Sequence, residues 1–408
     1  MLWRFNRNFQ YKRPILKIFF LSPISQVEKI DIQNPMDTIK IKAGEIVVGN
    51  TLPWPVYDKN RRLLLNEGEL ISSQGQLQVL LEHGLYRENN TRHANKKGGT
   101  ANDDILNPFE KVDQLATALN HVFFNIVNKK PDCERKVNTV SVEVQRLCEW
   151  DANAALGAVH LCHHKPYTVW HPLHVAMLSE LITKRMGYRP QARLTVINAA
   201  LTSNIAMLEL QESLYRQDTP LSDDQKKAIQ QHCQHGVGML HDADINDQLW
   251  LDIVFQHHEK IDGSGYPVGL DGDAINKEAL VISLSDRYSA MISPRSYREG
   301  MTAQNALGNL FIKKGKEFSQ DVAVMFIKEL GVYPPGSFVK LNNDEIAIVI
   351  KRGQDTTAPV VCSLVRPQGE YYERPVLRDS GRKDYAIKEI CPRIKTTSLY
   401  LPRLWGYN

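Results

Sequence analysis

Residues 257–267 read His257-His258-Glu259-Lys260-Ile261-Asp262-Gly263-Ser264-Gly265-Tyr266-Pro267. The preceding residues, 249–255, are mostly apolar and favour a buried helix. The glycines and the proline within the stretch favour an irregular loop. Because neighbouring helical residues point about 100° apart, two adjacent histidines can reach one metal cluster only near a helix end. The pattern therefore predicts two imidazoles where a buried helix opens into a loop. A pair of solvated surface histidines is the alternative.

This stretch resembles the H-H-E-x-x-D-G-x-G-Y-P signature of the HD-GYP family, a bacterial branch of the HD metal-dependent phosphohydrolases. Members of that family hydrolyse cyclic di-GMP, and the resemblance extends from about Tyr167 to about Val332. It implies a mainly α fold, in which an HD-type helical bundle is flanked by small N-terminal and C-terminal β-rich modules. It also implies a partner-binding surface at Gly265, Tyr266 and Pro267.

The resemblance further implies metal ligands outside this stretch. His171 falls in the family pattern Y-T-x-x-H, His232 falls in H-x-x-x-G, and Asp286 falls in D-x-Y-x-A. With His257 and His258 they form the expected ligand set. His174, one helical turn after His171, is expected to be structural.

Two arginines follow the last of these motifs. Arg295 and Arg298 match the family's R-x-Y-R, which implies that they hold phosphate or guanine. Arginine suits that task because its planar guanidinium is always charged and donates in a fixed fork. Solvated surface arginines are the alternative.

One family motif is altered in this chain. The family reads A-A-L-L-H-D-I-G-K, whereas residues 199–207 read A-A-L-T-S-N-I-A-M. Ser203 thus stands where the resemblance places a ligand histidine, Asn204 where it places a bridging aspartate, and Met207 where it places a phosphate-facing lysine. Asparagine is a poor replacement because its amide is neutral and offers one good ligand atom. The position that would rely on His171 and Asp286 is expected to be empty or weakly filled.

The other metal position retains three histidine nitrogens as expected ligands. His232, His257 and His258 could hold one divalent transition metal, Fe, Mn or Zn, with water in the fourth place. Glu259 is expected to orient one of these imidazoles. The literal His241-Asp242 dipeptide is expected to lie in a surface turn and not to bind metal.

Length and composition limit the number of domains, the classes of partner and the location that the protein can have. A chain of 408 residues predicts two or three domains, and a net charge of +4 argues against binding a nucleic acid polymer. Six cysteines without a C-x-x-C pair predict reduced thiols in a cytoplasmic protein. The apolar run at residues 15–21 is far shorter than the ~20 residues of a transmembrane helix. Its basic surroundings would allow peripheral contact with the inner membrane.

Composition and periodicity also divide the chain. The predicted divisions are a basic extension (1–38), a small β-rich module (39–90), a polar linker (91–104), connecting helices (105–158), an HD-GYP-like helical domain (159–333) and a C-terminal β extension (334–408).

Three hypotheses about function follow. The first is a non-catalytic signalling protein that binds cyclic di-GMP, or a partner such as a GGDEF-type cyclase. The second is a residual phosphodiesterase that uses a single metal. The third is a structural adaptor with vestigial sites. The connecting helices could also support a homodimer.

Overall fold

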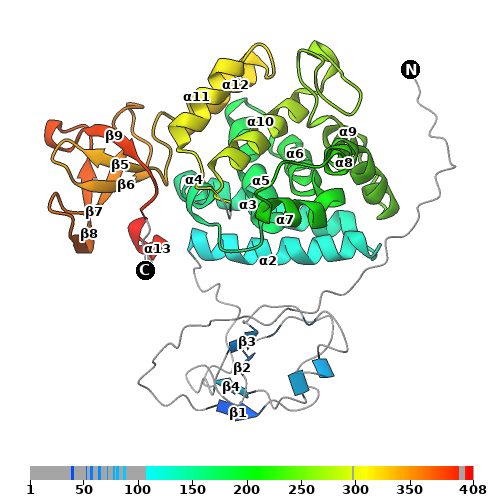
Figure 1. The fold of residues 1–408 in the computed structure, drawn as a ribbon, viewed down its shortest axis with the longest axis horizontal. Helices are drawn as coiled ribbons and strands as arrows, with labels where there is room; N and C mark the ends of the chain where they lie inside the picture. Colours follow the sequence, from blue (N-terminus) through cyan, green and yellow to red (C-terminus); the bar gives the residue numbers. More distant parts are fainter. Residues whose placement is uncertain are drawn as a thin grey trace. The chain divides into compact units, whose positions relative to one another are not determined.

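The computed structural model describes residues 107–295, 298–394 and 400–407, together with short stretches between residues 38 and 88. The chain divides into two compact units, Met1–Gly99 and Thr100–Asn408. Figure 1 shows the second unit as a helical bundle with a small sheet beside it. The predicted fold class, mainly α with small β-rich modules, is confirmed.

The N-terminal unit contains short antiparallel strands. Their order in the sheet is β1-β4-β2-β3. Their bounds are Thr38–Lys40 (β1), Val56–Tyr57 (β2), Leu63–Leu65 (β3) and Tyr86–Glu88 (β4). Strands β2, β3 and β4 lie within residues 39–90, where the sequence predicts a small β-rich module, whereas the linker predicted at 91–104 lies outside the described residues.

The helices of the second unit follow one another with short connections. They are α2 (Pro108–Val127), α3 (Cys133–Trp150), α4 (Ala152–Leu161), α5 (Tyr167–Arg185), α6 (Pro190–Thr202), η1 (Ile205–Met207), α7 (Leu208–Arg216), α8 (Asp223–Asp242), α9 (Gln248–Gln256), η2 (Gly272–Ala274), α10 (Lys277–Ile292), α11 (Ala303–Lys313) and α12 (Gln320–Leu330).

Helix α5 lies at the centre of the bundle. Almost all of its residues are buried, and it packs against α2, α3, α4, α6, α10 and α12. A helix that is apolar on every side is stable only when other helices surround it. Its one buried carboxylate, Glu180, accepts from the Arg193 guanidinium of α6 at 2.9 Å, so the charge is compensated. This packing fixes the position of His171 on its first turns.

The helices before α5 belong to the same hydrophobic core as the bundle. Buried residues of α2, α3 and α4 join those of α5 to α12 in one cluster. Helices α3 and α4 are separated at Asp151, whose Oδ1 accepts from the N–H groups of Asn153 and Ala154 and caps α4. The boundary predicted near residue 159 stays a prediction.

A five-stranded antiparallel sheet follows the bundle, with strand order β8-β7-β6-β5-β9. Its elements are β5 (Phe338–Leu341), β6 (Ile346–Lys351), β7 (Val360–Val365), β8 (Tyr371–Asp379), η3 (Lys383–Tyr385) and β9 (Ile387–Cys391). All of these strands lie within residues 334–408, where the sequence predicts a C-terminal β extension. The side chains of β8 are exposed or half-buried.

The last described helix, α13 (Leu401–Leu404), returns to the bundle. Trp405 packs edge to face on Phe109, with ring centroids 5.0 Å apart, and covers Gly157 so closely that a Cβ there would lie 2.4 Å from its ring. Tyr407 donates to Asp151 at 2.9 Å. This contact could not be predicted, because the two segments are far apart along the chain.

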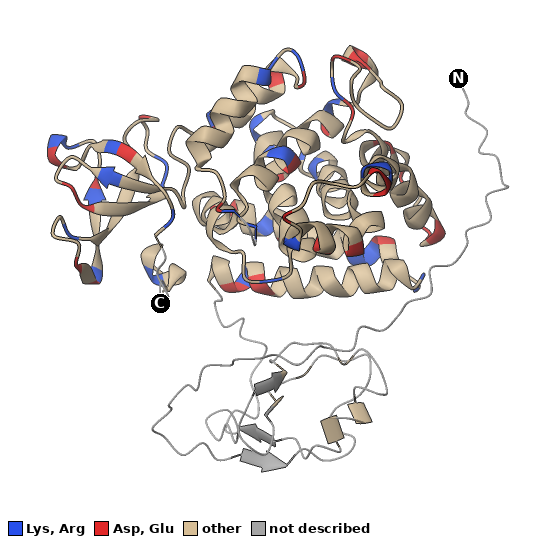
Figure 2. Ribbon diagram, in the orientation of Figure 1, with Lys and Arg blue, Asp and Glu red and all other residues tan. Residues whose placement is uncertain are grey.

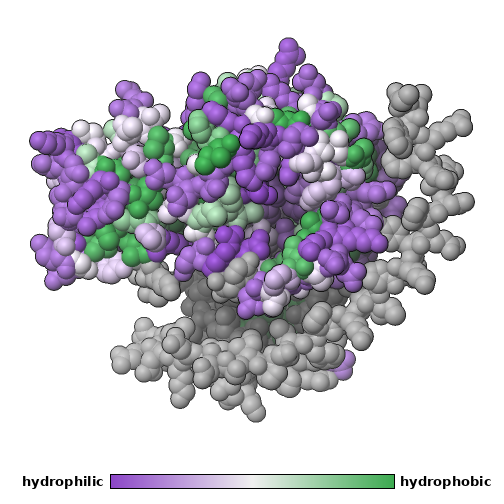
Figure 3. Space-filling model, turned by 45° about the horizontal axis from the view of Figure 1, so that its top comes forward, coloured by the Kyte–Doolittle hydropathy of each residue, from purple (hydrophilic) through white to green (hydrophobic). Residues whose placement is uncertain are grey.

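On the part of the chain that the structure describes, basic and acidic residues are mixed. Figure 2 shows lysines and arginines interspersed with acidic residues along the described helices. Figure 3 shows a mostly hydrophilic face with separate hydrophobic patches. Among the described residues, no helix combines the length and the apolar character needed to cross a membrane.

Candidate metal centre

Two buried histidines from different helices face each other. His257 ends α9, and its ring N–H at Nδ1 donates to the Val254 carbonyl at 2.7 Å. His232 lies in α8, and its Nδ1 donates to the Ile229 carbonyl at 2.5 Å. Because both Nδ1 atoms hold their protons, both Nε2 atoms present lone pairs. These two Nε2 atoms are 3.3 Å apart.

His258 lies against the same pair. Its ring centroid is 4.1 Å from that of His257 and 5.0 Å from that of His232. Tyr266 stacks on its outer side, with centroids 4.8 Å apart. The structure therefore brings together the three histidines that the sequence assigned to one metal position.

Burial keeps these imidazoles uncharged. It lowers the pKa of His232, lowers that of His257 to about 4, and lowers that of His258 well below its ordinary value. The neutral form is the one that binds a metal ion. The residues thus fit a divalent transition metal in both geometry and protonation.

The loop after the histidines is built by close backbone contacts. Tyr266 N–H donates to the His258 carbonyl at 3.2 Å. Gly265 lies so near the preceding backbone that a Cβ would be 2.4 Å from the Lys260 nitrogen. Gly265, Tyr266 and Pro267 therefore form a fixed wall of the histidine cluster, and their predicted role in partner binding stays a prediction.

The expectation for Glu259 was wrong. Its buried carboxylate does not orient an imidazole but accepts from the backbone N–H groups of Val268, Gly269 and Leu270 at 2.8–3.1 Å. A buried carboxylate stabilises a neighbouring loop by accepting hydrogen bonds from backbone N–H groups that have no partner in a strand or helix. Sequence spacing could not reveal this, because the partners are backbone atoms.

His171 and Asp286 form a second pair. His171 Nε2 lies 2.8 Å from Asp286 Oδ1, and Ser289 Oγ lies 3.2 Å from His171 Nδ1. Burial opposes the charge on Asp286, but the hydrogen bond from His171 and the nearby imidazoles hold the pKa of this carboxyl well below its usual range. Asp286 also acts electrostatically on His232, His257 and His258.

The altered motif lies beside α8. The Ser203 carbonyl is 3.8 Å from the place of a Cβ on Gly236, which is one turn after His232. Ser203 is buried, and its hydroxyl donates to the Ala200 carbonyl at 3.3 Å. Asn204 is also buried and directly precedes η1, which ends at Met207. The assignment of these three residues to lost ligand and lysine positions stays a prediction.

Arg295 and Arg298 lie near the His171 side of the site. Their backbones pair with each other, Arg295 N–H donating to the Arg298 carbonyl at 2.8 Å, whereas Tyr297 lies outside the described residues. Burial raises the pKa of Tyr167, and the charges of both arginines oppose that rise. The Tyr167 ring stacks on His171, with centroids 4.8 Å apart, so both arginines act at the edge of the site.

Other predictions concern residues outside the cluster. Asp242 of the literal His241-Asp242 dipeptide pairs with Lys129 at 2.8 Å on the surface, but the predicted turn is wrong, because both residues of the dipeptide end helix α8. His174 is buried against Trp170 and His163. Cys233, read from the sequence as a packing residue, lies within the histidine cluster. Its place directly after His232 was the signal that could have shown this.

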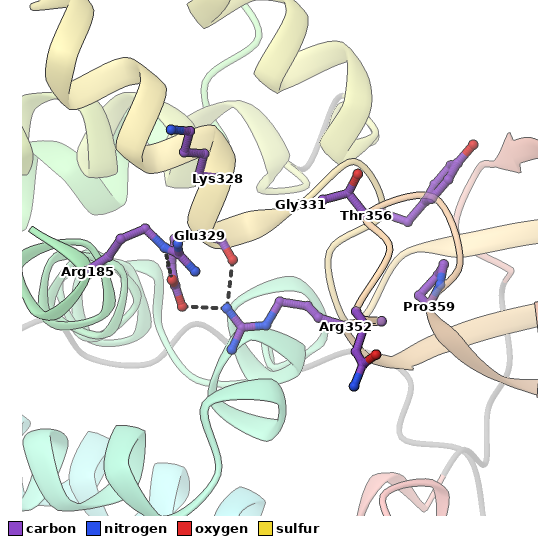
Figure 4. A pocket seen from close by; sticks show the side chains of 10 residues that line it. Arg185, Lys328, Glu329, Gly331, Arg352, Thr356 and Pro359 are labelled. Atoms are coloured by element: carbon purple, nitrogen blue, oxygen red, sulfur yellow. Dashed lines mark hydrogen bonds and ion pairs between the residues drawn. The ribbon is translucent and has the colours of Figure 1, made fainter. Parts of the chain in front are cut away.

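A cavity of about 440 Å³ lies elsewhere, between the bundle and the sheet. Figure 4 shows Arg185 and Arg352 both directed at Glu329, which accepts from each of them. Arg185 is fourteen residues after His171 on the same helix, which places it about 21 Å along the axis. The cavity is therefore separate from the histidine cluster. Two of the arginines that line it are already paired with Glu329.

The comparisons with known proteins agree with this geometry. A family model described as an HD domain matches residues 137–322. Cyclic di-GMP phosphodiesterase PA4108 of Pseudomonas aeruginosa is 28% identical over 226 residues, which are 55% of this chain and 53% of that protein. Cyclic di-GMP phosphodiesterase response regulator RpfG of Xanthomonas campestris pv. campestris is 29% identical over 139 residues, covering 34% of this chain and 37% of that protein. The chain thus spans about half or less of these relatives.

One solved structure shares the fold. Bd1817, an HDG"Y"P protein from Bdellovibrio bacteriovorus, aligns with a TM-score of 0.50 at 15% identity and covers 72% of this chain and 99% of that one. The residues that the family model matches include α8 and α9, the helices that carry the histidine cluster. Residues 137–322 thus match the HD domain, and the chain is similar in sequence to cyclic di-GMP phosphodiesterases.

Proposed function

We propose that this protein is a cyclic di-GMP signalling protein whose HD-GYP domain binds the nucleotide, or a protein partner, without hydrolysing the nucleotide. The observation that carries the proposal is the presence of Ser203 and Asn204 in the altered motif, whose Ser203 carbonyl lies beside Gly236 of α8. The Ser203 hydroxyl cannot replace an imidazole ligand, and the Asn204 amide cannot replace a carboxylate that bridges two ions. Two-metal catalysis requires both ions, because one activates water while the other stabilises the leaving oxygen.

The contact between His171 and Asp286 supports the same proposal. These two residues would need further ligands to hold a second ion. In their present arrangement the imidazole and the carboxylate satisfy each other at 2.8 Å. What remains is one site at His232, His257 and His258, which suits a single divalent transition metal such as Fe, Mn or Zn.

Nucleotide binding is proposed at the edge formed by Tyr167, Arg295 and Arg298. The permanent positive charges of the arginines suit a phosphodiester. The loop with Gly265, Tyr266 and Pro267 is the proposed surface for a GGDEF-type protein. A cytoplasmic location fits the free thiols of all six cysteines.

Calorimetry and metal analysis test the proposal. We expect cyclic di-GMP to bind, at most one metal ion per chain, and no measurable turnover of the nucleotide. Arg298→Ala should weaken binding about 10- to 100-fold, as expected for the loss of one charged hydrogen bond. Arg135→Ala, on the exposed face of α3, is the matched control. Two or more ions per chain with steady turnover would contradict a non-catalytic role.

The retained histidines favour a second candidate, a residual phosphodiesterase that uses one metal. Turnover that is lost on His257→Ala would support it. If neither turnover nor nucleotide binding is found, the third hypothesis, a structural adaptor, stands. Restoring the family pattern with Ser203→His and Asn204→Asp should raise metal content if the register of this motif is correct.

A further inference from the structure

The thiol of Cys233 lies inside the histidine cluster. Its Sγ is 3.7 Å from Nε2 of His232 and 3.8 Å from Nδ1 of His257. Ligand atoms of these three residues all lie within 4.8 Å of one another, and all three residues are buried. The thiol therefore faces the same small space as the imidazoles.

The spacing matches a tetrahedral ion. With metal–nitrogen bonds of about 2.0–2.1 Å and a metal–sulfur bond of about 2.3 Å, two nitrogens should lie about 3.3–3.4 Å apart and nitrogen and sulfur about 3.6 Å apart. The corresponding distances are 3.3 Å between the two Nε2 atoms and 3.7 Å from Sγ to His232 Nε2.

The hydrogen bonds of the cluster also favour a cation between His232 and His257. His232 and His257 each donate their Nδ1 proton to a backbone carbonyl, so their facing Nε2 atoms have no proton to share. Two lone pairs at this separation repel each other unless a positive charge lies between them. A metal ion supplies that charge and can also accept the sulfur.

We propose that Cys233 is a metal ligand, which makes this a Cys-His site selective for a thiophilic divalent ion such as Zn²⁺ or Co²⁺. His232 and His257 supply the nitrogens. These three ligands fill three places of a tetrahedral ion, and one of them is a thiolate, as in Cys-His zinc sites. On binding, the thiol loses its proton to solvent and sulfur donates an electron pair to the ion. The inference rests on the proposed function and names the residues that would hold its single retained metal.

Cobalt spectroscopy tests the ligand directly. Metal-free protein titrated with Co²⁺ should develop the near-ultraviolet charge-transfer band of a thiolate–cobalt bond and saturate at one ion per chain. Cys233→Ser should abolish the band and lower Zn²⁺ affinity at least about tenfold, since even residues that only orient a ligand affect affinity by that much. Cys148→Ser, a buried thiol in α3, is the control and should keep the band.

X-ray absorption of the zinc form gives a second measurement on the unaltered protein. It should show one sulfur at about 2.3 Å together with nitrogen ligands. A zinc shell of nitrogen and oxygen alone, or a cobalt band that persists in Cys233→Ser, would overturn the inference. Both measurements use protein without nucleotide. If Cys233 proves not to bind metal, the calorimetric test of cyclic di-GMP binding is therefore unaffected. If cyclic di-GMP does not bind, the metal measurements are likewise unaffected.

Discussion

At the residue scale, the histidine cluster depends on backbone contacts that only glycine allows. A Cβ on Gly265 would meet the Lys260 nitrogen at 2.4 Å and the Glu259 Cα at 2.5 Å. Both neighbours are backbone atoms and cannot rotate away. The loop would have to move, and with it Tyr266, whose ring covers His258.

Gly265→Ala should therefore destabilise the protein by about 1–3 kcal/mol, the usual cost of forcing atoms into a packed site. It should also weaken metal binding. Thermal unfolding and metal titration measure the two effects. Gly238→Ala in α8 is the control, because a Cβ there meets nothing within 4 Å. It should gain about 0.5–1 kcal/mol from the higher helix propensity of alanine. Equal behaviour of the two variants would contradict this account.

The sequence identified most of the cluster but not all of its contacts. His232, His257 and His258 were recognisable because motif spacing places them. Cys233 and the true role of Glu259 were not, because a buried thiol reads as packing and backbone N–H partners carry no sequence signal. The direct contact of His171 with Asp286 likewise depends on how α5 and α10 pack, not on either motif.

At the element scale, the C-terminal sheet is organised around one buried carboxylate. Glu345 accepts from Ser363 Oγ at 2.5 Å, from the Tyr372 hydroxyl at 2.7 Å and from both Nε and Nη2 of Arg378 at 3.0 and 2.9 Å. Burial opposes its charge, but these donors lower the pKa of Glu345 to about 2. Strands β7 and β8 are thereby tied to the turn before β6.

Glu345→Gln should destabilise the protein by about 2–4 kcal/mol, because the Arg378 guanidinium loses its counter-charge. The effect should depend on pH. A carboxyl whose pKa falls from 4.5 when unfolded to about 2 when folded stabilises the protein above pH 4.5, and this stabilisation is lost as the pH falls toward 2.

Denaturant unfolding across that range measures both effects. The variant should show a flatter pH dependence than the parent protein, and the two should converge at low pH. Glu373→Gln, an exposed position in β8, serves as the control and should leave stability unchanged. A variant that keeps the parent's acid sensitivity would show that another carboxyl is responsible.

At the scale of the whole molecule, the bundle and the sheet are joined by charged contacts and by aromatic packing. Glu329 of α12 accepts from Arg185 of α5 and from Arg352, which follows β6. Arg352 also donates from Nε to Asn153 at 3.0 Å. None of these pairs was predictable, because each partner comes from a different part of the chain.

Glu329→Gln should separate the unfolding of the sheet from that of the bundle, since two guanidinium groups lose a shared acceptor of opposite charge. Differential scanning calorimetry should then show two transitions where the parent protein shows one. Lys328 lines the same cavity, and Lys328→Ala is the control. A single transition at an unchanged midpoint would mean that Trp405 and its contacts with Phe109 suffice to couple the two parts.

Helix α5 carries His171 near its beginning and Arg185 at its end, and neighbouring helices enclose it between them. A rod confined in this way has little freedom to bend. We therefore expect a rotation or slide of this helix at Arg185 to be transmitted to His171 without any side chain that spans the distance.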